Sequence, residues 1–109
     1  MIKSAAEIRY FEIGCEVGEM VIQAIVDTAR AGASRNEIRA KIMDTLLRNG
    51  CETYNLLIYG VGTAINHAGQ GGYAERRGQK VPEHGDIILA EFDAKYQGYQ
   101  AQFNQPFVV

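Results

Sequence analysis

His67 is the residue of this sequence best suited to proton transfer. It lies within a glycine-rich stretch, residues 60–78. An imidazole titrates near neutral pH and serves as a general acid or base when a neighbouring group tunes it. A surface-loop histidine with no catalytic task is the alternative, and the residue type alone leaves both interpretations open.

Glu91 and Gln102 are a second pair of side chains that could act together. Ile87 to Phe92 is a short apolar run typical of a buried strand, and a polar segment ending at Gly98 separates it from a second arm. This pattern predicts a β-hairpin with Glu91 and Gln102 on facing arms. Glutamate binds hard cations through oxygen, whereas a neutral amide is a poor substitute for a bridging carboxylate. The returning arm carries Tyr99, Ala101, Phe103 and Phe107.

A long N-terminal helix is the first element expected to support the hairpin. Ser4 and Glu7 have the spacing of a capping box, and the apolar periodicity that follows continues to about Arg30. The apolar residues form two neighbouring stripes, so the helix needs cover on more than one side. Gly14 and Gly18 are four residues apart, which predicts a face that another part of the backbone approaches closely.

A second helix and a strand complete the predicted elements. Ser34 and Glu37 form another capping box, and the helix is expected to end near Asn49. Residues 54–60 form a buried strand by their apolar and β-branched content. The fold class is therefore α+β, with two N-terminal helices packed on a small antiparallel sheet. The inward face of the second helix is expected to contain Ile38, Ile42 and Leu46, with Met43 and Leu47 as further candidates.

Composition limits the classes of function. The 109 residues are 47% hydrophobic and carry a net charge of −2, which fits one domain over residues 1–109 and gives no electrostatic basis for binding nucleic acid or an anionic membrane. No signal peptide or membrane-length apolar run is present. Cys15 and Cys51 lack metal-binding spacing, so we expect two buried, reduced thiols in a cytoplasmic protein; a disulfide between them is the alternative.

The segment from Gly85 to Val109 resembles, without a gap, the metal-binding hairpin of the creatinase and Xaa-Pro aminopeptidase family, pita-bread hydrolases related to methionine aminopeptidase. The residues that match the family pattern are Gly85, Asp86, Tyr96, Gly98, Tyr99 and Phe107. The loop from Gly32 to Glu37 and the pair Asn49-Gly50 also resemble the family. Each motif is weak alone, but their order and spacing are specific over nearly the whole chain.

This resemblance implies the N-terminal half of a pita-bread catalytic domain. In metal-dependent members two spaced aspartates of the hairpin bind a two-metal centre, and here Glu91 and Gln102 stand at those positions. Asp93 replaces a small residue of the family pattern. We therefore expect no metal pair and no cofactor. The resemblance implies that His67 is the catalytic proton carrier and that Glu91, Tyr99 and Gln102 bind the substrate.

Two functions follow from the resemblance. The first is a half-domain that is not catalytic alone and serves as a binding or assembly module, as in the histone-chaperone subunit that keeps an inactive pita-bread domain. The second is part of a metal-independent hydrolase of C–N bonds in small amide, guanidino or peptide substrates. The family's remaining catalytic histidine and glutamates lie in a second half that these 109 residues do not contain.

Self-association is the last expectation. The wide apolar arc of the first helix and the apolar residues 106–109 at the end of the hairpin both need cover. A symmetric homodimer is the simplest way to provide it, because a two-fold contact requires only one self-complementary surface.

Overall fold

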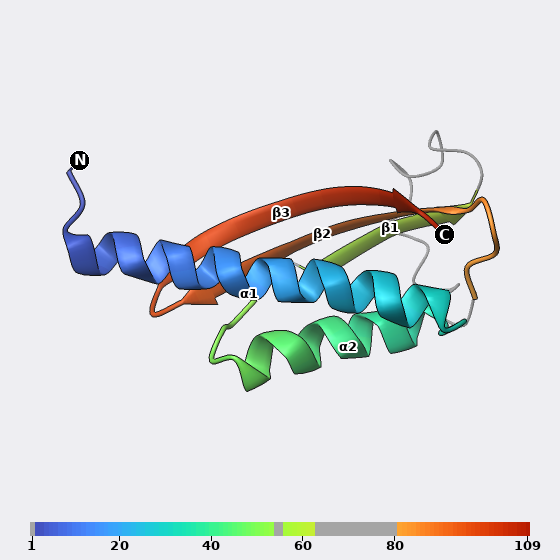
Figure 1. Ribbon diagram of the computed structural model, residues 1–109, viewed down its shortest axis with the longest axis horizontal. Helices are drawn as coiled ribbons and strands as arrows, with labels where there is room; N and C mark the ends of the chain where they lie inside the picture. The colour runs from blue at the N-terminus through green and yellow to red at the C-terminus, as the bar shows by residue number, and fades with distance from the viewer. Residues whose placement is uncertain (1, 54–55, 63–80) are drawn as a thin grey trace.

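The computed structural model describes residues 2–53, 56–62 and 81–109, with two helices and three strands (Figure 1). The predicted α+β class, with two N-terminal helices packed on a small antiparallel sheet, is confirmed. The elements in chain order are α1 (Ala5–Arg30), α2 (Arg35–Arg48), β1 (Leu56–Gly62), β2 (Ile87–Tyr96) and β3 (Tyr99–Val108).

Both helices begin at the predicted capping boxes. The Ser4 backbone N–H donates to Glu7 Oε2 at 2.7 Å, and the Ser34 backbone N–H donates to Glu37 Oε2 at 2.7 Å. In each box the serine hydroxyl accepts the backbone N–H of the glutamate in return. These bonds satisfy backbone donors that the first turn of a helix leaves unpaired, which fixes where α1 and α2 start.

The sheet has the order β1-β2-β3, with both neighbouring pairs antiparallel. The predicted hairpin is confirmed: β2 and β3 pair without interruption from Ile87 opposite Val108 to Tyr96 opposite Tyr99. Gln97 and Gly98 form its two-residue turn with φ values of 49° and 86°. Two positive φ values are characteristic of the turn type whose twist matches antiparallel strands.

The helices cover one face of the sheet (Figure 1). Helix α1 runs along β2 and β3 and also contacts α2, while α2 contacts β1. The core lies between these layers, since alternate residues of β2 are fully buried there. The central buried residues are Val17, Val21, Ile25, Ile38, Ile42, Leu46, Ile88, Ala90, Phe92 and Ala94.

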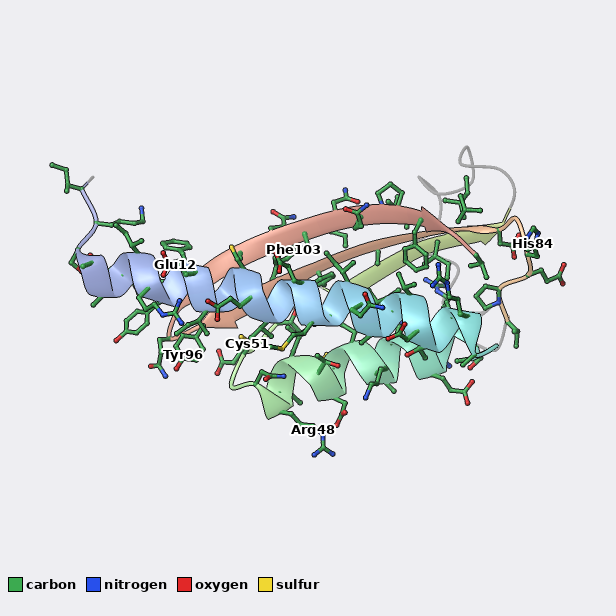
Figure 2. All side chains as sticks on the ribbon, viewed as in Figure 1. Glu12, Arg48, Cys51, His84, Tyr96 and Phe103 are labelled. Atoms are coloured by element: carbon green, nitrogen blue, oxygen red, sulfur yellow. The ribbon has the colours of Figure 1, made fainter. Side chains whose placement is uncertain are left out.

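The two α1 glycines allow this close packing, as predicted. A Cβ atom added at Gly14 would lie 3.1 Å from the backbone oxygen of Ala94. At Gly18 it would lie 2.0 Å from Cζ of Phe103, whose position beside α1 is visible in Figure 2. The ring of Phe103 stacks on that of Phe92 at 5.1 Å between centroids. Helix α1 therefore approaches the hairpin through residues without side chains.

Some apolar side chains are less buried than expected. Leu47 is 60% exposed and Met20 is 51% exposed, because they lie on helix faces that neither the sheet nor the other helix covers. Cys15 is exposed, which corrects the expectation of two buried thiols, whereas Cys51 is buried. Both cysteines are free, so the disulfide alternative is not formed. Neither of the two described helices is long and apolar enough to cross a membrane.

Candidate functional site

Glu91 and Gln102 lie on the sheet face that points away from α1 and α2, here called the outer face. The side chains of a strand alternate between faces, and Ala90 and Phe92 on either side of Glu91 belong to the core. Glu91 pairs with Asn104 across the hairpin, so Gln102 is its diagonal neighbour. Gln102 Nε2 donates to Glu91 Oε1 at 2.7 Å. The hairpin therefore brings two of the predicted site residues into contact.

This pair does not fit a two-metal centre. Such a centre needs anionic oxygens that bridge the ions, and Gln102 supplies a neutral amide. Its N–H is directed to the Glu91 carboxylate, which is the arrangement of a hydrogen-bonded pair. Within the described ranges, no three His, Cys, Asp or Glu side chains are grouped closely enough to hold a metal ion.

Asp93 is a third polar residue of the outer face, for which the sequence pattern predicts no role. It pairs directly with Gln102 across the hairpin and follows Glu91 by two residues, so all three side chains are on one face. Asp93 is only 2% exposed, and among the described residues its Oδ1 has no hydrogen-bond donor. The period-two spacing from Glu91 was the sequence signal that could have identified it.

Tyr99 lies apart from this group. The odd-numbered residues at the start of β3 face α1, whereas Gln102 faces the other way. The Tyr99 hydroxyl donates to Glu7 Oε1 at 2.8 Å, and this bond raises the pKa of Tyr99. The pKa of Glu7 is lowered, chiefly by the hydrogen bond from the Ser4 backbone. Tyr99 thus joins the hairpin to the capped start of α1.

His67, the predicted proton carrier, lies outside the described residues. Its catalytic role is therefore a prediction from residue type and resemblance. Glu91 and Gln102 are held together on the outer face by the hairpin.

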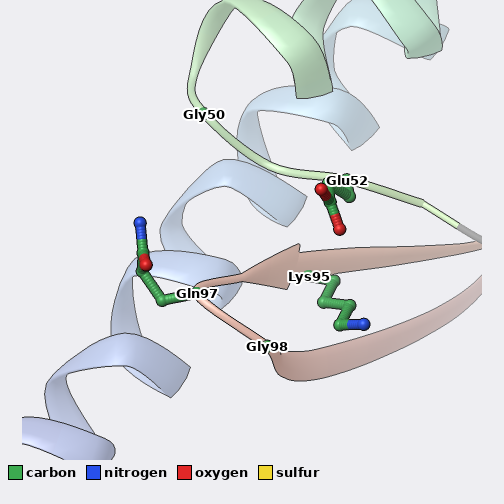
Figure 3. A pocket seen from close by; sticks show the side chains of 5 residues that line it. All are labelled: Gly50, Glu52, Lys95, Gln97 and Gly98. Carbon is green, nitrogen blue, oxygen red and sulfur yellow. The ribbon is translucent and has the colours of Figure 1, made fainter.

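A small pocket of about 280 Å³ lies at the turn of the hairpin (Figure 3). Backbone hydrogen bonds between Glu52 and Lys95, at 2.8 and 2.9 Å, hold its two sides together. Of the predicted site residues that the structure describes, Glu91, Tyr99 and Gln102, none lines this pocket. Its lining residues are Gly50, Glu52, Lys95, Gln97 and Gly98.

The two helices on a three-stranded antiparallel sheet agree with the N-terminal half of a pita-bread fold that the sequence resemblance implied. Residues 9–109 match metallopeptidase family M24. Because this match covers most of the chain, the chain belongs to family M24.

Similar proteins agree with this assignment. The Xaa-Pro dipeptidase of Pyrococcus horikoshii is 28% identical over 112 residues, and that of Pyrococcus furiosus is 26% identical over 112 residues. Each alignment covers 100% of this chain and only 30% of the relative. The chain therefore spans less than a third of the length of these relatives.

Two solved structures share the fold. The prolidase from Pyrococcus furiosus superposes with a TM-score of 0.75 at 24% identity, over 98% of this chain and 32% of that one. The X-Pro aminopeptidase from Thermotoga maritima superposes with a TM-score of 0.73 at 26% identity, over 100% of this chain and 30% of that one.

Proposed function

We propose that these 109 residues form a substrate-binding half-domain of an M24-type protein and do not hydrolyse a substrate alone. The observation that carries this proposal is the hydrogen bond from Gln102 to Glu91, at 2.7 Å, where the family pattern has two carboxylates. An amide paired with a carboxylate can orient a polar substrate through hydrogen bonds. It lacks the negative charge that would hold two divalent ions close together.

The substrate class is a small amide, guanidino or peptide compound. Its support is the polar outer face, together with relatives that are named Xaa-Pro dipeptidases. Glu91 and Gln102 would contact the substrate, and His67 would carry its proton. Tyr99 is not included in this role, because its hydroxyl is directed to Glu7 on the helix side of the sheet. The two free cysteines suit a reducing compartment such as the cytoplasm.

A second candidate is a hydrolase of C–N bonds that becomes active when another polypeptide segment completes the domain. The preformed pair of Glu91 and Gln102 favours this candidate, since such a pair would position an amide or guanidino group beside a histidine. Incubating the 109-residue chain with Xaa-Pro dipeptides and guanidino acids tests whether it hydrolyses them alone. No product is expected, and turnover that His67→Ala abolishes would contradict the proposal that the chain is inactive alone.

Loss of the metal pair gives a direct prediction. After dialysis against manganese and then against metal-free buffer, elemental analysis is expected to find fewer than two ions per chain, because Gln102 cannot bridge two cations. The variant Gln102→Asp restores the missing carboxylate and is expected to retain more manganese than the wild type. Two retained ions per wild-type chain would contradict the proposal.

We also propose that the chain forms a symmetric homodimer. Strand β3 is an edge of the described sheet, and Val108 near its end is 66% exposed. An open strand edge beside exposed apolar side chains is a surface that a second copy can cover. Helix α1 adds Met20, which is 51% exposed.

Sedimentation equilibrium over a hundredfold concentration range tests this dimer. The mean mass is expected to rise from 12.0 kDa towards twice that value, and the melting temperature is expected to rise with it. Val108→Lys should weaken the association, because lysine on a strand edge opposes pairing. Val81→Lys is the matched control, since Val81 is also exposed but lies outside the strands. A constant mass of 12.0 kDa would contradict the dimer.

A further inference from the structure

The pocket at the hairpin turn (Figure 3) includes neither Glu91 nor Gln102 and takes no part in the proposed function. Its volume is about 280 Å³, just below the range of about 300–1,000 Å³ that is typical of sites for drug-sized ligands. Its lining side chains, those of Glu52, Lys95 and Gln97, are all polar, and its other two residues are glycines. The size and the lining therefore suit a small, polar molecule.

Two opposite charges meet at this pocket from adjacent segments of the chain. Glu52 and Lys95 form an antiparallel bridge, in which the backbone N–H of each donates to the carbonyl oxygen of the other, at 2.8 and 2.9 Å. Side chains of directly opposed residues project to the same side, with Cβ atoms about 4.5–5.5 Å apart. The Glu52 carboxylate forms no ion pair with a described residue. The backbone thus fixes the origin of both side chains, and the carboxylate can accept a ligand.

Gln97 supplies a third polar group at a conformational cost. Its φ of 49° is in the left-handed region, and no other non-glycine residue of the described ranges has a positive φ. The first central position of such a turn favours Asn or Gly, because longer side chains rarely adopt this conformation. Strained backbone of this kind concentrates at ligand sites, so the choice of Gln points to a use of its side chain. Its amide offers both a donor and an acceptor.

We propose that this pocket binds a free α-amino acid as the zwitterion, with the ligand's ammonium group on Glu52, its carboxylate on Lys95 and the Gln97 amide as a third contact. One negative and one positive side chain match a dipolar ligand without net charge. A phosphate ion would be repelled by Glu52, and a polyamine would be repelled by Lys95. Because no apolar side chain lines the pocket, glycine and serine suit it better than large apolar amino acids.

Titration of the ¹⁵N-labelled 109-residue chain with glycine, followed by two-dimensional NMR, tests this site. Saturable shifts are expected for the backbone amide signals of the five lining residues. The expected Kd is on the order of 10⁻³ M, because exposed ion pairs contribute little affinity. N-Acetylglycine lacks the ammonium group and glycinamide lacks the carboxylate, so each should bind at least about threefold more weakly than glycine.

Charge exchange tests the two ion pairs. Glu52→Lys and Lys95→Glu should each weaken glycine binding about fivefold, because each surrounds a dipolar ligand with two like charges. The double variant exchanges the two charges and should restore binding to within about threefold of the wild type, with the ligand reversed. Glu19→Lys and Lys41→Glu make the same charge changes at exposed helix positions outside the pocket and should bind glycine like the wild type.

Gln97→Asn separates the role of this residue in the turn from its role in the pocket. Asparagine adopts the left-handed conformation more readily, so the melting temperature should rise. Its shorter amide should not reach the ligand, so glycine binding should weaken about threefold. A variant that binds glycine as tightly as the wild type would remove Gln97 from the site.

Three outcomes would overturn the amino-acid site as a whole. The first is the absence of saturable shifts with glycine up to about 50 mM, well above the expected Kd. The second is binding of acetate as tight as that of glycine, which would assign the pocket to a simple anion. The third is a double charge-exchange variant that binds no better than either single variant. Each would leave the proposed half-domain function standing, because Glu91 and Gln102 do not line this pocket.

Discussion

Replacing Gly18 by alanine is expected to destabilise the chain by about 3 kcal/mol, even though alanine is the better helix former. The added Cβ would lie 2.0 Å from Cζ of Phe103. That ring cannot easily retreat, because it stacks on the fully buried Phe92 with an interplanar angle of 9°. Overpacking of this kind typically costs about 1–3 kcal/mol and occasionally more, whereas helix propensity alone would stabilise by about 1 kcal/mol. Urea denaturation measures directly whether the free energy of unfolding falls or rises in this variant.

Two further variants locate the cause of the Gly18 effect. Gly14→Ala places its Cβ 3.1 Å from the backbone oxygen of Ala94, which is tight but not overlapping, so a smaller loss is expected. Phe103→Leu in the Gly18→Ala background should recover part of the stability, and the two changes together should cost less than their sum. A Gly18→Ala variant that is as stable as the wild type would mean that α1 does not pack on the hairpin as described.

The helices and the hairpin could be predicted because their signals are local. Each capping box joins residues three apart, and the apolar periodicity of α1 and α2 extends over several turns. The spacing of Gly14 and Gly18 also indicated correctly that α1 is approached closely on one face. Local patterns of this kind are decided by backbone geometry and need no knowledge of the rest of the fold.

The length of β2 was underestimated for a physical reason. The expected strand ended at Phe92, but β2 continues to Tyr96. Asp93 and Lys95 made the following residues look like a polar turn, whereas they occupy the outer face of a strand whose inner residues remain apolar. When polarity is averaged along the sequence, the alternation of polar and apolar residues in a strand is lost.

The candidate site was predicted only in part, because its composition depends on the side of the sheet to which each residue belongs. Glu91 and Gln102 were placed together correctly, since the turn at Gln97 and Gly98 fixes the register of the hairpin. Tyr99 was grouped with them, but its side chain is on the face of β3 that points to α1. Its hydroxyl donates to Glu7 there. Asp93 received no role, because the burial of its carboxylate, whose Oδ1 has no donor among the described residues, is a property of the folded chain that composition cannot reveal.

The alternation of side chains along β2 also connects the core to the outer face. Glu91 and Asp93 flank Phe92 on β2, so the ring that fills the core also fixes the segment that carries both carboxylates. The ring stacks on Phe103, which in turn contacts Gly18 of α1. Helix packing thus determines how rigidly β2 presents its polar residues on the other side of the sheet.

Phe92→Ala is therefore expected to have the largest effect of any single truncation in the hairpin. Phe92 is fully buried and its ring contacts Phe103, so its removal leaves a cavity in the layer between α1 and the sheet. Such changes cost about 3–5 kcal/mol, a large share of the 5–15 kcal/mol that stabilises an ordinary domain. At about 4 °C or more for each kcal/mol, the melting temperature should fall by at least about 12 °C in a calorimetric scan.

Phe107→Ala is the matched control for this truncation. It removes the same atoms from the far end of β3, where the ring is only half-buried and packs at the margin of the core. Because less apolar surface is lost from the interior, the expected cost is less than half that of Phe92→Ala. Equal costs for the two variants, or a cost below about 1 kcal/mol for Phe92→Ala, would contradict the stack as the link between α1 and the hairpin. The outer face would then need a different source of rigidity, such as the surface that a second copy of the chain would cover.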